Sequence, residues 1–204
     1  MKVSVLDRIL LSITSLLAAY QVAVGIEGFT TFSVIAYTIA FGTLLIAGLL
    51  ILILGFDVLD APIVVIVSTI IPLSLSLGLV WEHLLSLRDL YLAFVLVGFL
   101  AVVGTRIIRF ENKLPAIVLI LVHGISGMTI FLLPIACSLQ GIVGAAFSLV
   151  GVGGALIGIG GLLLAFLKTG KPIIKRDKIL KVLPALMLLM TICFVVGFRF
   201  GSQN

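Results

Sequence analysis

Long apolar runs, separated by short polar segments, make up nearly the whole chain. The hydrocarbon core of a bilayer is about 30 Å thick, and a helix needs around 20 mostly apolar residues to cross it. Seven runs suit such a crossing and cover roughly residues 9–26, 29–55, 61–81, 89–108, 114–137, 140–167 and 180–198. They are continuously apolar, whereas the strands of a membrane barrel alternate apolar and polar residues. The pattern therefore predicts an all-α bundle of seven transmembrane helices.

The boundary between the fifth and sixth runs is the least marked. Apart from His123, residues 114–167 contain no acidic or basic side chain, yet they are too many for one crossing. The most polar point of this stretch is the segment from Cys137 to Gly141. We therefore predict that the chain turns there.

The composition agrees with a chain that lies almost entirely in the membrane. Hydrophobic residues make up 62% of the 204 residues and charged residues 10%, against about 45–50% and roughly 25% in soluble domains. We therefore expect a single integral membrane domain over residues 1–204. The net charge of +5 comes from basic residues that lie between apolar runs, without interleaved aromatic residues. This placement argues against a nucleic-acid partner, and the expected partners are the lipid bilayer and other membrane subunits or a second copy.

Lysine and arginine residues are divided very unevenly between the two ends of the predicted bundle. With seven spans, one end receives only Arg88 and Arg199. The other end receives eleven: Lys2, Arg8, Arg106, Arg109, Lys113, Lys168, Lys171, Lys175, Arg176, Lys178 and Lys181. Because short basic loops stay in the cytoplasm, we predict a multi-pass protein of the cell or plasma membrane, with its N-terminus in the cytoplasm and its C-terminus outside. The first run also resembles a signal peptide; we expect it to be retained, and its removal would leave six spans in the same orientation.

A duplication is visible between the two halves of the chain. At one constant spacing, Gly42, Gly48 and Pro72 recur as Gly154, Gly160 and Pro184. Spans 1–3 and 5–7 would then be parallel repeats joined by the fourth span, a 3+1+3 arrangement of the kind used by transporters. The alternative is chance agreement in a sequence that is rich in leucine and glycine.

Few polar side chains lie inside the predicted spans. His123 is the one ionisable side chain deep within a span, and Ser126 and Gln21 are the other intramembrane polar candidates. His123 and Ser126 share one helix face. Ionisable groups in membrane helices often mark proton relays or substrate contacts. The alternative is a neutral histidine that donates a hydrogen bond to a carbonyl of a neighbouring helix.

A second group of polar side chains gathers at the end predicted to lie outside. Glu27, Glu82 and His83 belong to it, but they have no diagnostic ligand spacing, and we predict no metal site. His83 and His123 lie about 15 Å apart in depth at 1.5 Å of helix rise per residue, so they cannot both ligate one haem. We predict no cofactor and interpret this group as a solvated rim.

Cys137, His83 and Arg199 are catalytic candidates for a membrane thiol enzyme. The segment Ala136-Cys137-Ser138 resembles the Ala-Cys-Ser-Gly nucleophile segment of exosortases and archaeosortases, polytopic transpeptidases that act at the outer membrane face. The resemblance covers three residues, and Leu139 replaces the glycine. The asparagine that precedes the family's arginine is missing, and the histidine comes earlier in the chain rather than later. Such nucleophile signatures transfer poorly between families, so a non-enzyme is the favoured interpretation.

Glycine dominates the sixth run. Small residues let helices approach closely, and the glycines on one side of this run predict a packing face: Gly144, Gly151, Gly154, Gly158 and Gly161. We expect this helix to be central and to be contacted on two sides. Glycine-rich helices also line transport pathways, where backbone carbonyls are needed.

The segment from residue 168 to residue 181 is strongly basic. Anionic lipid headgroups attract such segments, and the predicted headgroup contacts are Lys171, Lys175, Arg176, Lys178 and Lys181. The alternative is that these residues only fix the orientation of the chain. Asp57 and Asp60, at the same end of the bundle, are interpreted as helix caps.

Three functions are consistent with these patterns. The repeat, the glycine-rich helix and the intramembrane polar groups favour a transporter or channel for a small solute or ion. No carboxylate lies at the bilayer midplane, so coupling to protons or sodium would depend on His123 or on backbone carbonyls. The first alternative is a non-catalytic subunit of a larger membrane complex. The second is the enzyme with its thiol site at the outer face.

Overall fold

The computed structural model describes residues 3–108, 113–168 and 175–201, apart from the side chains of residues 162–168. Nearly all of these residues are helical, and none of them forms a strand. The seven α-helices are α1 (Val5–Val24), α2 (Thr31–Leu54), α3 (Pro62–His83), α4 (Arg88–Ile107), α5 (Leu114–Leu139), α6 (Ser148–Lys168) and α7 (Arg176–Gly201). Short 3-10 helices lie in the loops: η1 (Phe56–Asp60), η2 (Leu85–Leu87) and η3 (Ala145–Phe147). The predicted all-α bundle of seven helices is confirmed.

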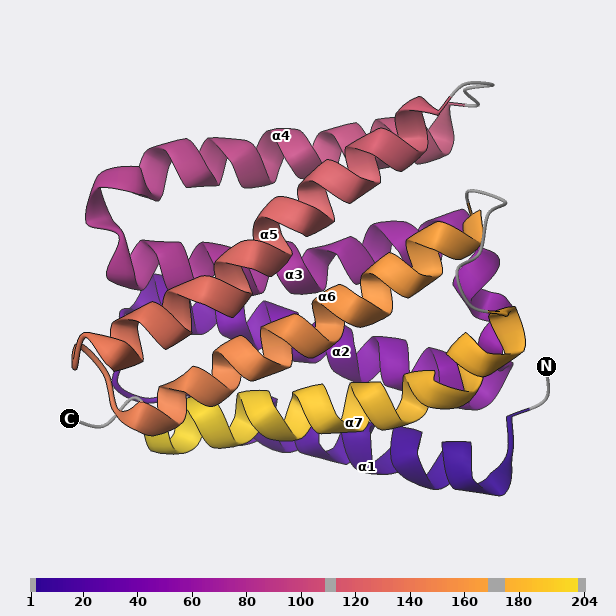
Figure 1. Ribbon diagram of the computed structural model, residues 1–204, viewed down its shortest axis with the longest axis horizontal. Helices are drawn as coiled ribbons and strands as arrows, with labels where there is room; N and C mark the ends of the chain where they lie inside the picture. Colours follow the sequence, from indigo (N-terminus) through magenta and orange to yellow (C-terminus); the bar gives the residue numbers. More distant parts are fainter. Residues whose placement is uncertain (1–2, 109–112, 169–174, 202–204) are drawn as a thin grey trace.

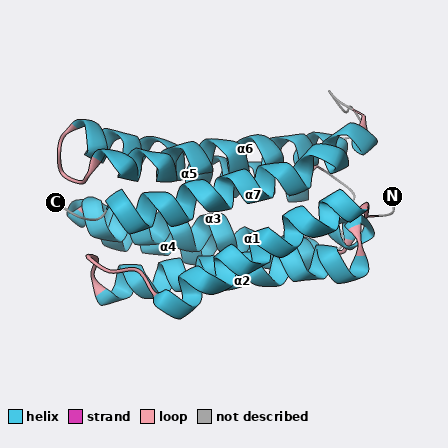
Figure 2. Cartoon of the chain, turned by 90° about the horizontal axis from the view of Figure 1, so that it is seen from below, coloured by secondary structure: helices cyan, strands magenta, loops and turns pink. Residues whose placement is uncertain are grey.

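The helices run side by side along one long axis, with the loops gathered at the two ends (Figures 1 and 2). The N-terminus lies at one end of the bundle and the C-terminus at the opposite end (Figure 1). We refer to these as the N-terminal end and the C-terminal end of the bundle. An odd number of crossings requires this separation of the termini.

Most of the helices have the length and composition of membrane spans. Among the described residues, α1, α2, α3, α4 with η2, α5 and α7 are long and apolar enough to cross a membrane. The described side chains of α6 end at Gly161 and belong to a shorter apolar stretch, Ala145–Gly161. Large apolar side chains such as Leu16, Leu96 and Leu100 are exposed on the outside of the bundle, which suits a surface in contact with lipid. The chain is a multi-pass integral membrane protein.

Local sequence signals explain where several helices begin and end. The Ser4 N–H donates to Asp7 Oδ2 (2.9 Å) and the Asp7 N–H donates to Ser4 Oγ (3.2 Å), which caps the start of α1. Pro62 lies in the first turn of α3, where its missing N–H costs no helical bond. Gly25 and Gly55 follow directly after α1 and α2, and their positive φ angles of 79° and 82° favour glycine.

The sixth helix begins later than the sequence predicted. The chain turns after α5 as expected, but the helix begins at Ser148 instead of at residue 140. The reason is a set of bonds at Gly144, whose N–H donates to the Gly201 carbonyl (2.9 Å) and whose carbonyl accepts from Ser138 Oγ (3.3 Å). These bonds hold residue 144 in the turn beside the end of α7. The prediction that Gly144 belongs to the packing face of this helix is therefore wrong.

Six of the helices form a closed ring. Neighbouring helices contact each other in the order α1, α2, α3, α5, α6, α7 and back to α1. α4 lies outside this ring, packed on α3 and α5 (Figure 1). Exchanging α1–α3 with α5–α7 maps this ring onto itself, as it would for any ring of six helices in this order, so the predicted parallel repeat stays a prediction. In that exchange the α3–α5 contact corresponds to the α7–α1 contact.

The ring interior is filled by aromatic side chains towards the C-terminal end. This aromatic cluster consists of Phe29, Tyr37, Phe41, His83, Phe147, Phe194 and Phe198. Its closest pair is Tyr37 and Phe198, with ring centroids 4.5 Å apart. Gly78 makes room for Tyr37, because a Cβ there would lie 2.4 Å from a ring carbon of the tyrosine. Most of these rings belong to the main apolar core of the bundle, which they fill at this end.

Candidate functional site

The ring interior is hollow towards the N-terminal end. A cavity of about 890 Å³ lies between α2, α3, α5, α6 and α7 and extends to η1. Proteins bind small molecules in cavities of roughly 300–1,000 Å³. This central cavity is therefore large enough to hold a sizeable organic ligand.

Glycines of α5 and α6 give the central cavity much of its width. Gly124 and Gly127 line it from α5, and Gly158, Gly160 and Gly161 line it from α6. A Cβ at any of these positions would have no neighbouring atom within 4 Å. The backbones of α5 and α6 are therefore separated by open space along this part of the ring.

The same two helices are in close contact towards the C-terminal end. A Cβ at Gly151 would lie 2.6 Å from the Phe131 carbonyl oxygen, and a Cβ at Gly154 would lie 2.7 Å from Ile130 Cγ2. On another side of α6, a Cβ at Gly153 would lie 2.6 Å from the Phe194 ring of α7. The prediction that this helix is contacted on two sides is confirmed.

The glycines predicted to form one packing face therefore have two different roles. Gly151 and Gly154 pack against α5 as predicted, whereas Gly158 and Gly161 face the central cavity. For the latter two the packing prediction is wrong, and the alternative of a glycine-lined cavity describes them better. The physical reason is that α5 and α6 separate before they reach the N-terminal end of the bundle.

Among the described residues, the lining of the central cavity is mostly apolar, made largely of leucine, isoleucine, valine and methionine side chains together with Phe131. Ser68 is one of the few polar lining residues, and its hydroxyl donates to the Val65 carbonyl of its own helix (3.1 Å). A bare ion would find few partners to replace its hydration shell on such a surface. The lining is suited to an apolar or amphipathic molecule.

His123 is the polar side chain that faces the cavity from α5. Its Nδ1 lies 3.1 Å from the carbonyl oxygen of Leu119. A carbonyl oxygen only accepts, so this bond requires a proton on Nδ1 and leaves Nε2 of a neutral ring as an acceptor. The sequence alternative named a carbonyl of a neighbouring helix, which is wrong, because the partner belongs to α5 itself. Ser126 is fully buried and does not line the cavity.

An ion pair lies at the mouth of the central cavity. The Arg176 guanidinium at the start of α7 contacts the Asp60 carboxylate of η1 at 2.5 Å, and both residues line the cavity. Their side chains are 48% and 59% exposed, so the cavity reaches the protein surface here. The interpretation of Asp60 as a helix cap is wrong, because α3 has Ala61 as its N-cap and no side-chain cap.

The basic segment before α7 is described only in part. Lys175, Lys178 and Lys181 are exposed, and their contact with lipid headgroups stays a prediction. Arg176 was predicted to bind headgroups too, but in the structure it pairs with Asp60. Lys171 lies outside the described residues.

The candidates for a thiol enzyme do not form a joint site. Cys137 is only 4% exposed and lies in the main apolar core. The His83 ring packs on Phe29 and Phe147, with centroids 6.3 and 5.6 Å away. Arg199 lines a separate small pocket beside Gln21. In the described part of the chain, no hydrogen bond joins these three candidates.

Two further expectations from the sequence concern metals and disulfides. Over residues 3–108, 113–168 and 175–201, no group of three or more histidine, cysteine, aspartate or glutamate side chains is placed to hold a metal ion. Cys137 and Cys193 are both free thiols, so the disulfide that the sequence left open is not formed.

The central cavity itself could not be predicted from the sequence. The nearest signal was the glycine content of the sixth run together with Gly124 and Gly127 beside His123, which did not distinguish helix packing from open space. No family model matches the chain, and no curated protein or solved structure matches it. Function therefore has to be inferred from the cavity and its surroundings.

Proposed function

We propose that this protein is a membrane carrier that binds an apolar or amphipathic small molecule inside the helix ring. The observation that carries the proposal is the central cavity, which reaches the protein surface at the Asp60–Arg176 pair, whereas the aromatic cluster fills the ring interior towards the other end. A carrier that exposes its site to one side at a time needs this combination of an open and a closed end.

The class of substrate follows from the lining. Apolar side chains surround most of the cavity, and among the described lining residues the charged ones, Asp60 and Arg176, lie at its mouth. An amphipathic molecule would place its apolar part among the leucines and methionines and its polar group beside Asp60 and Arg176. Small inorganic ions are disfavoured, because a carrier for them needs polar ligands near the middle of the membrane.

The position of the ion pair supports movement between two halves of the ring. Asp60 follows α2 and precedes α3 in the first half, whereas Arg176 begins α7 in the second half. The pair therefore links the two predicted repeats across the mouth of the cavity. Rocking of one repeat against the other is a common way to alternate access, and it would break or form this bond.

The proposed location is the cell membrane, with the mouth of the cavity facing the cytoplasm. Support comes from the positive-inside rule, because the sequence predicts that eleven of the thirteen lysines and arginines lie at the end that holds the N-terminus. Two cysteine variants test the orientation: in cells, a membrane-impermeant maleimide should label Glu27→Cys but not Lys178→Cys. If only Lys178→Cys is labelled, the protein has the opposite orientation in the membrane.

A cavity-filling variant tests the carrier. Gly127→Trp would place an indole in the central cavity, whereas Gly104→Trp on α4 is a matched control, because its Cβ also meets open space outside the cavity. The purified protein in nanodiscs should increase the emission of dansyl-labelled lauric acid in a saturable manner. Gly127→Trp should abolish this binding and Gly104→Trp should keep it.

Transport is then measured in proteoliposomes. Wild-type protein and Gly104→Trp should exchange the probe, or any apolar molecule that copurifies and is identified by mass spectrometry, faster than empty liposomes. Equal binding by Gly127→Trp would refute the cavity as the site, and saturable binding without any exchange would refute the carrier. The alternative of a non-catalytic subunit stays a prediction, which the particle size in mild detergent addresses.

A further inference from the structure

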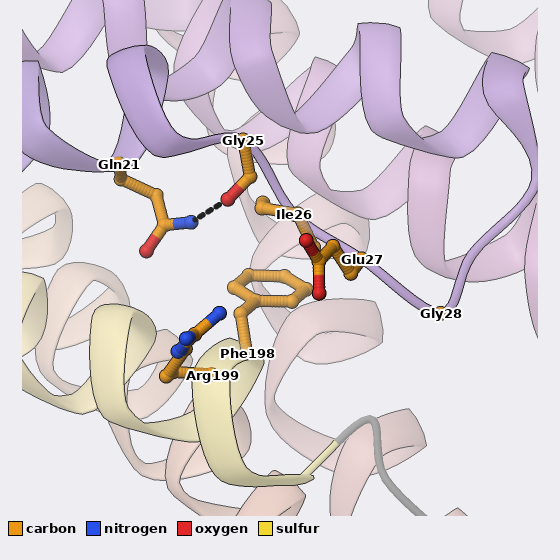
Figure 3. A pocket seen from close by; sticks show the side chains of 7 residues that line it. All are labelled: Gln21, Gly25, Ile26, Glu27, Gly28, Phe198 and Arg199. Atoms are coloured by element: carbon orange, nitrogen blue, oxygen red, sulfur yellow. Dashed lines mark hydrogen bonds between the residues drawn. The ribbon is translucent and has the colours of Figure 1, made fainter.

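A second, smaller cavity lies at the C-terminal end of the bundle, outside the central cavity. It has a volume of about 230 Å³ and is formed by the end of α1, the loop that follows it and the last turns of α7. Figure 3 shows its lining, with Gln21 and Glu27 on the α1 side and Phe198 and Arg199 on the α7 side. Phe198 also belongs to the aromatic cluster, so this end pocket is separated from the central cavity by that cluster.

Gln21 supplies a buried hydrogen-bond acceptor to the end pocket. Its side chain is only 4% exposed, and its Nε2 donates to the Gly25 carbonyl at 2.7 Å (Figure 3). Its Oε1 is buried and has no hydrogen-bond partner among the described residues. A buried amide oxygen without a donor is unfavourable, so this atom is suited to a donor that a ligand brings.

The rim of the end pocket carries one positive and one negative side chain. Arg199 and Glu27 are both exposed and come from opposite sides of the pocket (Figure 3). No ion pair joins them in the described part of the chain. Two opposite charges held apart at one pocket complement a ligand that itself carries two separated charges.

We propose that the end pocket binds a small zwitterion that carries a primary ammonium group and an acidic group. The acidic group would bind the Arg199 guanidinium, whose planar donors suit carboxylates and phosphates. The ammonium group has three donors, enough for the Glu27 carboxylate and the unpartnered Gln21 Oε1. The volume fits a compact ligand, because it is below the roughly 300–1,000 Å³ of pockets for drug-sized molecules.

Two sources share this chemistry: free amino acids and the head group of ethanolamine phospholipids. The full-length protein in phosphatidylcholine nanodiscs is titrated with glycine and with O-phosphoethanolamine, and binding is measured by calorimetry. In a second arm, native mass spectrometry compares lipid retention from nanodiscs with and without phosphatidylethanolamine. Saturable binding of the free compounds identifies a solute site, and selective retention of phosphatidylethanolamine identifies a lipid site.

Variants of the pocket decide whether either signal comes from this site. Arg199→Gln, Glu27→Gln and Gln21→Leu should each weaken binding or retention by about tenfold or more. Arg88→Gln and Asp89→Asn remove one charge of each sign from the same end of the bundle but outside the pocket, and they should bind like wild type. Because Arg199 and Glu27 are exposed, their variants should fold, which the thermal midpoint verifies.

Two results would overturn the proposal. One is the absence of saturable binding of either free compound together with equal retention of both phospholipids. The other is unchanged binding by Arg199→Gln and Glu27→Gln. Neither result bears on the carrier, because dansyl-laurate binding in the central cavity uses none of these side chains.

Discussion

Two glycines of α6, one turn apart, provide a direct test of the central cavity. At Gly154, a Cβ would lie 2.7 Å from Ile130 Cγ2 and 2.9 Å from both the Ile130 carbonyl carbon and the Phe131 nitrogen. At Gly158, a Cβ would meet no atom within 4 Å. Replacement by alanine adds the same methyl group at both positions, so any difference in stability reports what that group meets.

The expected magnitudes follow from helix propensity and packing. Alanine is favoured over glycine inside a helix by roughly 0.5–1 kcal/mol, and both variants share this gain. Gly154→Ala also forces α5 and α6 apart, because two of its close atoms are backbone, and overpacking costs about 1–3 kcal/mol. At about 2–4 °C per kcal/mol, Gly154→Ala should melt about 2–12 °C below Gly158→Ala.

Thermal midpoints are measured on detergent-solubilised protein by fluorescence-detected size exclusion after heating. Gly104→Ala on α4 is the control for the propensity gain, because its Cβ also meets open space. Gly158→Ala should match this control and melt slightly above wild type. If Gly158→Ala melts as low as Gly154→Ala, α5 and α6 are in contact along their whole length, and the central cavity does not exist.

Three further predictions concern the two ends of the ring. The single changes Asp60→Arg and Arg176→Asp should each lower the thermal midpoint slightly, and the double change should restore it. The expected coupling energy is about 0–1 kcal/mol, because the ion pair is half exposed. A double-mutant cycle without any coupling would contradict an ion pair across the mouth of the cavity. Gly78→Ala should destabilise the bundle by about 1–3 kcal/mol, because Tyr37 is fully buried and cannot move aside freely. Tyr37→Leu should cost less stability in the Gly78→Ala background than on its own, because it removes the overlap. An unchanged midpoint for Gly78→Ala would argue against the tight contact. In a Cys193→Ala background, Cys137 should not react with a membrane-impermeant maleimide until the protein is denatured, because its side chain is only 4% exposed. Labelling of the native protein would show that the thiol is accessible and would contradict its burial.

The spans could be predicted from the sequence because bilayer thickness imposes one length on every helix and excludes charges from its interior. The turn after α5 was predicted from its polar residues alone. The start of α6 was not, because it depends on the bond between Gly144 and Gly201, which are far apart in the chain. Apolar content gives no signal for a boundary that a tertiary contact determines.

The candidate site was predicted less well than the fold, for a related reason. Glycine has the same sequence signature whether a helix packs against it, as at Gly154, or leaves space in front of it, as at Gly158. Only the angle between α5 and α6 distinguishes the two cases. Likewise, Asp60 was interpreted from the sequence as a helix cap, but its partner in the structure, Arg176, lies in the other half of the chain.

The uneven filling of the ring interior has a consequence for its motions. Local opening of a protein follows contact density, so segments with few buried contacts open at low free energy and dense segments open last. The helix segments around the aromatic cluster should therefore move least, and the amides near Tyr37 and Phe198 should exchange most slowly with solvent. Amides of α5 and α6 near Gly124 and Gly158 should exchange faster, and the amplitude of motion should increase steadily along the bundle towards the Asp60–Arg176 pair.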